Sequence, residues 1–427
     1  MLAASGVVDA GQQTSKPAGV SEASATERKT WDALKERFTK YSNYMSGNIW
    51  SLIHTYESQA EMEQSLKLFE SIMVSLASDD PATLKRFDGP KGYKSQLVQF
   101  MNSKDDTVSG FAAFLLAIIG DMKYAPQIAA LLTRNINLPP DKYPPITVRG
   151  RAAVALSLLG AKQYTEQIVP LLKSQNDYDR SGAAMALGYL KATEHAKEVV
   201  ELLLSEDLNL HDDDSAIHAL FEMGVAANYK KEIAQVLGVE RRWETSKTAA
   251  YALVRLGAKE YAKDIARRLE FQIGQGDAAK ALALLGAKEY ANEIASLLSN
   301  EDSFTREKAA LALGILGARD HAPALAKLLK DNEWWVRMGA AKALVLMEAT
   351  EYSREVLPII AEQKGGAYFD PSDFNELVTE QVNQLDTRFR AQLTRMKGQL
   401  PASRLELQTG AGAYLARSGV PALAHQW

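Results

Sequence analysis

Histidine and aspartate side chains are concentrated in one short stretch of the chain, His211-Asp212-Asp213-Asp214 followed by His218. Asp214 and His218 are four residues apart, so both could face one metal ion from the same side of a helix, with His211 reaching from the preceding turn. Acidic residues at a helix start also cap free N–H groups and suit the positive end of the helix dipole. The capping interpretation is the stronger, and we predict no metal site.

The sequence lacks the common motifs of catalysis. It contains no glycine-rich phosphate loop and no Gly-x-Ser-x-Gly turn around a nucleophile. The chain has no cysteine, which excludes disulfides, thiolate metal ligands and a cysteine nucleophile. The sequence therefore singles out no catalytic residue and predicts no cofactor.

The elements that would position a site come from a repeated phrase, which reads Leu-Gly-Ala-Lys-Glu-Tyr at 256–261 and 285–290. Its closing aromatic recurs at spacings of 31, 40, 31, 34, 32, 29, 31 and 31 residues, at Tyr93, Tyr124, Tyr164, His195, Tyr229, Tyr261, Tyr290, His321 and Tyr352. A fixed period in this range is typical of stacked helical repeats.

Each repeat is predicted to contain two helices. In the best example, residues 290–298 form the first helix and residues 306–316 the second, which Gly317 ends as a C-terminal cap. The second helix carries paired alanines, which let neighbouring backbones approach closely. The pairs recur at 112–113, 152–153, 183–184, 249–250, 278–279, 309–310 and 340–341, and the fourth repeat has Ala216-Ile217 instead. An arginine precedes four of the pairs by three residues, at Arg149, Arg180, Arg306 and Arg337.

These alanine pairs and arginines, and the run Asp-Asn-Glu-Trp-Trp-Val-Arg-Met-Gly-Ala-Ala-Lys-Ala-Leu at 331–344, resemble HEAT-like repeats. The resemblance is to the short-repeat type named after phycobilisome lyases, and it covers roughly residues 91–362. It implies an all-α fold, a right-handed α-solenoid of about nine two-helix repeats with helical caps. HEAT-type deoxyhypusine hydroxylases bind iron through His-Glu pairs, and no His-Glu dipeptide occurs here.

In HEAT-like folds the second helices line the concave face. The residue directly after each alanine pair and the residue four positions later then face the open side. In the middle repeats these positions hold Met185, Tyr189, His218, Glu222, Tyr251 and Arg255. Such a mixture of aromatic and charged side chains suits a recognition surface for a partner. In the alternative, Met185 and Tyr189 pack between repeats and the charges are solvated.

Two other segments compete as binding surfaces. Trp334 and Trp335 lie in the turn before a second helix, where one of them packs on the neighbouring repeat and the other is available to a partner. Alternatively, both pack against the C-terminal helix. The proline-rich insertion at 135–145 is either a binding loop or a rigid spacer.

Composition and periodicity predict five segments. Residues 1–26 are a disordered leader, residues 27–90 an N-terminal helical cap and residues 91–362 the repeats. Residues 363–400 form a C-terminal capping helix that starts near Asp370-Pro371, and residues 401–427 are a flexible tail.

The charge balance narrows the class of partner. The 427 residues carry a net charge of −4, which argues against a nucleic-acid partner because phosphate binding draws on excess positive charge. No stretch approaches the length of apolar sequence that spans a membrane. A cytoplasmic location is slightly favoured, and the missing cysteines leave a bacterial periplasmic or exported protein open. The sequence does not indicate an oligomeric state.

The repeats and the missing catalytic motifs predict a non-enzymatic scaffold or adaptor that binds a protein partner on the concave face. The resemblance leaves one alternative open, a bilin lyase-like or chaperone-lyase activity on a protein client.

Overall fold

The computed structural model describes residues 29, 31–32, 64–65, 67–69, 71–72, 74–75, 85–119, 121–134, 147–205, 212–238, 243–363 and 366–398. These residues form helices and turns, with no strand among them. They divide into two compact units, Met1–Ile128 with Asn135–Val148, and Ala129–Arg134 with Arg149–Trp427. The predicted all-α solenoid is confirmed.

The first unit contains the first repeat. Its helices are α3 (Tyr93–Met101) and α4 (Asp106–Ile119), followed by a 3-10 turn (Met122–Tyr124), and α5 (Ala125–Ala130) runs across the boundary between the units. The Phe69 ring lies 4.9 Å from the Phe111 ring of α4, measured between centroids. Ser109 donates a hydrogen bond from Oγ to the Met101 carbonyl at 2.6 Å, which ties the two helices together. Aromatic packing thus joins part of the predicted N-terminal cap to the first repeat.

The second unit alternates short first helices with longer second helices. The first helices are α7 (Thr165–Ile168), α9 (Ala196–Leu203), α11 (Lys230–Gln235), α13 (Ala262–Ala266), α15 (Ala291–Ser296), α17 (Ala322–Leu328) and α19 (Ser353–Ala361). The second helices are α6 (Val148–Leu158), α8 (Asp177–Leu190), α10 (Asp212–Met223), α12 (Trp243–Arg255), α14 (Gln275–Leu285), α16 (Ser303–Leu316) and α18 (Trp334–Leu346).

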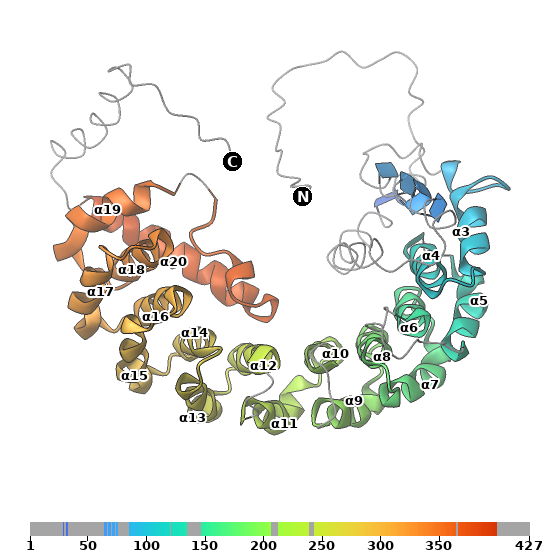
Figure 1. The fold of residues 1–427 in the computed structure, drawn as a ribbon, viewed down its shortest axis with the longest axis horizontal. Helices are drawn as coiled ribbons and strands as arrows, with labels where there is room; N and C mark the ends of the chain where they lie inside the picture. The colour runs from blue at the N-terminus through green and yellow to red at the C-terminus, as the bar shows by residue number, and fades with distance from the viewer. Residues whose placement is uncertain are drawn as a thin grey trace, which may run out of the picture. The chain divides into compact units, whose positions relative to one another are not determined.

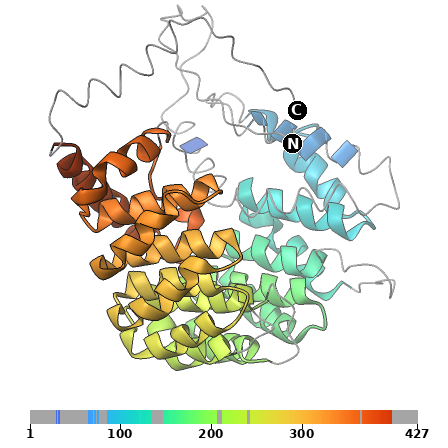
Figure 2. The same cartoon turned by 60° about the vertical axis from the view of Figure 1, so that its left-hand side comes forward.

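From α8 to α18 each second helix packs against the next one. Within this unit the first and second helices form separate rows, and the C-terminal helix α20 (Thr379–Gly398) lies on the side of the second helices (Figure 1). Figure 2 shows α20 beside α18 from another direction. We call the surface of α8 to α18 that faces away from the first helices the second-helix face.

The repeated phrase forms the connection between repeats. Gly286 ends α14 with a left-handed φ of 76°, and Lys288–Tyr290 then makes a 3-10 turn that leads into α15. The same turn recurs at Met122–Tyr124, Lys162–Tyr164, Thr193–His195, Ala226–Tyr229, Lys259–Tyr261, Arg319–His321 and Thr350–Tyr352. Eight of the nine closing aromatics therefore end a 3-10 turn, whereas Tyr93 begins α3. Further 3-10 turns follow the first helices at Leu131–Thr133, Val169–Lys173, Val236–Gly238, Arg267–Glu270 and Leu297–Ser299.

The arginines that precede the alanine pairs join one repeat to the next. Arg306 donates from Nε and Nη2 to both carboxylate oxygens of Asp331, each at 3.0 Å. Its Nη1 donates to the carbonyls of Asn300 and Glu301 at 2.9 and 3.0 Å. Arg337 donates in the same way to the Asp331 carbonyl at 2.8 Å. These arginines hold turns in place, because charge-assisted, bidentate bonds fix geometry strongly.

The predicted start of the C-terminal helix at Asp370 is wrong, because α20 begins at Thr379. Two 3-10 turns precede it, Pro371–Asp373 and Glu376–Val378. Between them Asn375 is extended, with φ −162° and ψ 143°, and its side chain accepts a hydrogen bond from the Leu377 N–H at 3.0 Å. This bond caps the N-terminus of the turn that leads into α20, and the extended Asn375 prevents a continuous helix from Asp370. Residues 366–378, which we call the C-terminal segment, therefore cross the second-helix face as non-α-helical chain.

Several predicted segments lie outside the described residues. These are the leader at 1–26, the tail at 401–427, most of the cap at 27–90 and the insertion at 135–145. Among the described helices, none is long and apolar enough to span a membrane.

The close stacking of second helices leads to a prediction at Gly314 of α16. A Cβ atom there would come 2.5 Å from the Cα atom of Ala343 in α18. Alanine normally favours a helix over glycine by about 0.5–1 kcal/mol, but this contact is with backbone and would force two helices apart. We expect Gly314→Ala to lower the free energy of unfolding by about 1–3 kcal/mol in urea denaturation.

Gly398→Ala is the control, because a Cβ atom at Gly398 meets no atom within 4 Å. We expect it to leave the stability nearly unchanged. Equal effects of the two substitutions would contradict the close contact between α16 and α18.

Candidate functional site

The C-terminal segment covers the second-helix face from repeat 8 back to repeat 4. It contacts Lys342 of α18, Lys280 of α14 and His218 of α10. Its 3-10 turn Glu376–Val378 also packs on α12. The segment thus reaches far beyond the last repeat, which it was expected to cap.

Two lysines bind the segment by the same pair of contacts. Lys280 donates from Nζ to the Asp373 carbonyl, and its Nζ lies 4.1 Å from the ring centroid of Phe374, the next residue. Lys342 donates from Nζ to the Tyr368 carbonyl and lies 5.3 Å from the ring of the following residue, Phe369. Each lysine therefore holds one main-chain carbonyl and the aromatic side chain after it. An ammonium over an aromatic face is attracted by the ring's electron density.

Both lysines come directly after an alanine pair. We call this position, across the second helices, the variable column; it holds Met185, His218, Tyr251, Lys280, Leu311 and Lys342. The recognition surface expected from the sequence took only the first three of these residues. Among the other three, the signal for Lys280 and Lys342 was a lysine at the same repeat position in repeats 6 and 8.

A cluster of charges surrounds Lys280, whose side chain is buried with a residue exposure of 2%. Burial lowers the pKa of Lys280 from 10.5 to about 8, against the opposing effects of Asp277 and Glu307. Burial also lowers the pKa of Lys342 and raises that of Glu307. Lys308 forms an ion pair with Asp277 at 2.9 Å. A buried charge without a partner is costly. The carbonyls and rings of the segment, together with the Lys308–Asp277 ion pair, offset the cost of burying this cluster.

Tyr251 was expected on the open face, and the structure buries it completely, with 0% exposure. Its ring packs against Phe374 with centroids 6.5 Å apart at an interplanar angle of 71°. The hydroxyl has no hydrogen-bond partner among the described residues, and burial raises the pKa of Tyr251 well above its ordinary value. The C-terminal segment, which covers this position, was not anticipated.

The other predicted residues divide between covered and accessible positions. His218 faces Glu376 of the segment, with Nδ1 3.3 Å from a carboxylate oxygen. Glu222 pairs with Lys191 at 2.8 Å. Arg255 is exposed and lies over the Phe221 ring, 4.6 Å from its centroid. Met185 and Tyr189 of α8 are partly exposed.

Trp334 and Trp335 were expected in the turn before a second helix, and the structure makes them the first two residues of α18. They form an aromatic cluster, here called the tryptophan turn, with a residue that the sequence did not single out. Trp335 stacks on Phe304 of the preceding repeat, with centroids 5.5 Å apart and planes at 9°. Trp334 meets Trp335 edge-on at 6.0 Å and is 59% exposed. One tryptophan thus packs on the neighbouring repeat and the other faces solvent, and the cluster remains a second candidate surface.

The aspartate-histidine stretch shows no metal-binding arrangement in the described part of the chain, where no group of three histidines or carboxylates is close enough to hold an ion. His211 itself lies outside that part.

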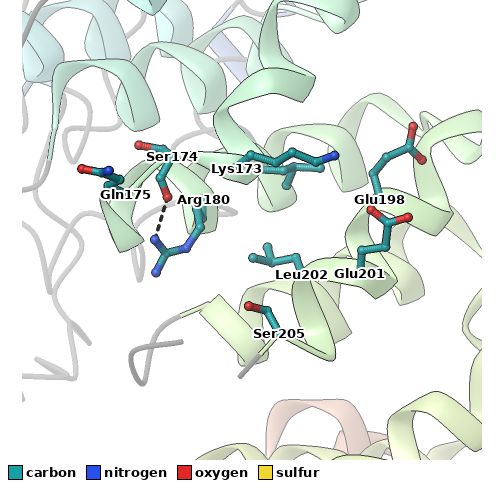
Figure 3. A pocket seen from close by; sticks show the side chains of 9 residues that line it. Lys173, Ser174, Gln175, Arg180, Glu198, Glu201, Leu202 and Ser205 are labelled. Atoms are coloured by element: carbon teal, nitrogen blue, oxygen red, sulfur yellow. Dashed lines mark hydrogen bonds between the residues drawn. The ribbon is translucent and has the colours of Figure 1, made fainter. Parts of the chain in front are cut away.

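A polar cavity of about 450 Å³ lies between α9 and the turn before α8 (Figure 3). Lys173 and Arg180 line it together with Glu198 and Glu201. Arg180 donates to the Ser174 carbonyl at 2.7 Å, as the equivalent arginines do elsewhere. The carboxylate of Glu198 accepts a hydrogen bond from its own backbone N–H and another from His195, and both lower its pKa. The cavity mixes opposite charges, and its arginine belongs to the repeat architecture.

Comparisons with known proteins support the repeat interpretation. Residues 261–345 match the sequence profile of the family described as HEAT repeats. The resemblance to HEAT-like repeats is therefore confirmed. No curated protein matches the chain significantly in sequence.

Similar solved structures include the CpcE and CpcF complex of phycocyanin lyase from Nostoc sp. PCC7120. It is 19% identical with a TM-score of 0.28, and the match covers 64% of this chain and 94% of that one. An engineered protein is 20% identical with a TM-score of 0.36, covering 75% and 92%. Human deoxyhypusine hydroxylase in complex with glycerol is 17% identical with a TM-score of 0.26, covering 60% and 96%.

The burial of Tyr251 leads to a pair of opposite predictions. Tyr251→Ala removes a fully buried ring from beneath Phe374, and we expect it to lower the free energy of unfolding by about 3–5 kcal/mol. Tyr251→Phe removes only a buried hydroxyl without a partner, so it should be neutral or stabilising by about 1 kcal/mol. Urea denaturation measures both. A harmless Tyr251→Ala would mean that the segment does not cover this face.

The pKa of Lys280 leads to a prediction about pH. Between its folded pKa of about 8 and its ordinary value of 10.5, the folded protein binds fewer protons than the unfolded chain. The free energy of unfolding therefore rises with pH across this window, by about 3 kcal/mol for this group. When the pH is raised across this window, the free energy of unfolding of the wild type should increase by this amount more than that of Lys280→Met. Urea denaturation at both ends of the window measures the difference.

Lys288→Met, which replaces an exposed lysine, is the matched control and should show no such gain. If both variants follow the same dependence on pH, Lys280 is not a buried ammonium.

Proposed function

We propose that this protein is a non-enzymatic scaffold or adaptor that binds a protein partner through its second-helix face. One observation carries the proposal. This face holds a non-α-helical stretch of polypeptide through main-chain carbonyls and aromatic rings, at Lys280 and Lys342. Those are contacts by which a repeat surface recognises a peptide or a loop of another protein.

The accessible part of the same face supports the proposal. Met185, Tyr189 and Arg255 lie in repeats 3 to 5, next to the positions that the C-terminal segment covers. Tyrosine and arginine are enriched among the residues that dominate binding energies at interfaces. Arg255 is already held over the Phe221 ring, so little side-chain entropy is lost when a partner binds it.

The proposal predicts which substitutions weaken binding. We expect Tyr189→Ala and Arg255→Ala, combined, to weaken the partner's affinity by about 10–100-fold, in line with losses of about 1–3 kcal/mol at such positions. The melting temperature should change little, because neither side chain is fully buried. The partner is first isolated with the full chain as bait, and its affinity is then measured by calorimetry.

Trp334→Ala is the control at the rival surface and should leave the affinity unchanged. If Trp334→Ala weakens the affinity and the Tyr189→Ala, Arg255→Ala variant does not, the binding site lies at the tryptophan turn.

The isolated partner also tests the enzymatic alternative, a bilin lyase-like or chaperone-lyase activity. Covalent transfer of a bilin to the isolated partner would overturn the scaffold function.

A further inference from the structure

The contacts of the C-terminal segment use groups that any polypeptide can supply. At Lys280 and again at Lys342, the lysine takes one main-chain carbonyl and the ring of the following residue. The two phenylalanines, Phe369 and Phe374, are five positions apart and meet lysines of repeats 6 and 8. A segment of another protein with the same two aromatic residues could make all of these contacts.

The covered face keeps polar groups that the C-terminal segment does not use. The Tyr251 hydroxyl and the Oδ1 atom of Asp277 are buried and have no hydrogen-bond partner among the described residues. Both side chains lie in the region of Lys280, since the charge of Asp277 contributes to the pKa shifts of Tyr251 and Lys280. A buried donor and acceptor left unpaired are costly, so a ligand that pairs them would gain affinity over the segment.

The contact at the far end of the segment is weak. Glu376 has 74% of its side chain exposed where it meets His218 at 3.3 Å, and an exposed pair of this kind contributes little. By contrast, Phe369 and Phe374 are buried, with exposures of 2% and 1%. Leu377 and Val378, in the turn that packs on α12, are buried as well. These buried apolar contacts, rather than the Glu376 pair, therefore hold the segment on this part of the face, and a competitor has to replace them.

We propose that the second-helix face of repeats 4 to 8 is a peptide-binding groove in which residues 368–378 are a built-in competitor. The partner inserts a segment with two aromatic residues about five positions apart and displaces these residues. A hydroxyl or amide side chain of the partner pairs with Tyr251 and Asp277. This inference rests on the proposed function, because it specifies the partner's chemistry and the control of the same surface.

A labelled peptide of residues 366–380 is the probe, added to the full chain and followed by fluorescence anisotropy. Phe369→Ala with Phe374→Ala loosens the built-in segment, so this variant should bind the peptide about tenfold or more tightly than wild type does. Adding Lys280→Met and Lys342→Met to the variant should abolish binding. The matched control peptide, with alanine at both phenylalanines, should not bind.

Because the chain has no cysteine, the segment can also be locked in place without disturbing its anchors. A variant with His218→Cys and Glu376→Cys, closed by a cleavable bismaleimide linker, keeps both phenylalanines seated. Peptide binding should be lost on closure and return when the linker is cut. This arm needs no loosening substitution, so it remains decisive if the alanine variant fails to fold.

The proposal is overturned if the peptide binds neither the folded alanine variant nor the unlocked protein at millimolar concentration, or if locking leaves its binding unchanged. Failure of this inference and failure of the proposed function are distinguishable. If the partner's affinity depends on Tyr189 and Arg255 but is unchanged by the closed linker, the scaffold function is supported. Only the inference that residues 368–378 compete with the partner is then wrong.

Discussion

No single repeat of this protein can bury its apolar surface alone, and the rest of the structure depends on that constraint. Second helices must lie against one another, and alanine pairs and a glycine such as Gly314 permit backbone contact between them. Arg306 and Asp331 then fix the offset of one repeat from the next. With the stack held by these contacts, the side chains of the second-helix face are free to differ between repeats.

The C-terminal segment and the lysines beneath it depend on each other. A buried ammonium such as that of Lys280 is costly without acceptors, and the segment supplies a carbonyl and a ring face. In return, the segment has no α-helical hydrogen bonds of its own up to Val378, so its carbonyls need donors from the repeats. Arg388 of α20 continues the pattern, donating to the Ile315 and Leu346 carbonyls at the ends of α16 and α18.

Local features of this fold were predictable and the long-range contact was not. The period, the two helices of each repeat and the glycine caps follow from residues close together in sequence, as at Gly286 and Tyr290. Phe374, Leu377 and Val378 fit a helical spacing, and the prediction failed because Asn375 forms a local bond instead. Tyr251 is buried by a segment more than a hundred residues away in the sequence. The periodicity of the repeats carries no information about such a long-range contact.

The side chains of the variable column differ from one repeat to the next, although the repeats stack in a similar way. Each residue of the column occupies the same position in its second helix, so the identity of that side chain decides what the helix contacts there. Lys280 and Lys342 bind carbonyls and rings, whereas Leu311 between them offers only apolar surface. A chain bound in the proposed groove would therefore have to place its aromatic residues two repeats apart. In that proposal, the spacing of aromatic residues in the ligand, rather than its overall charge, decides which ligand is recognised.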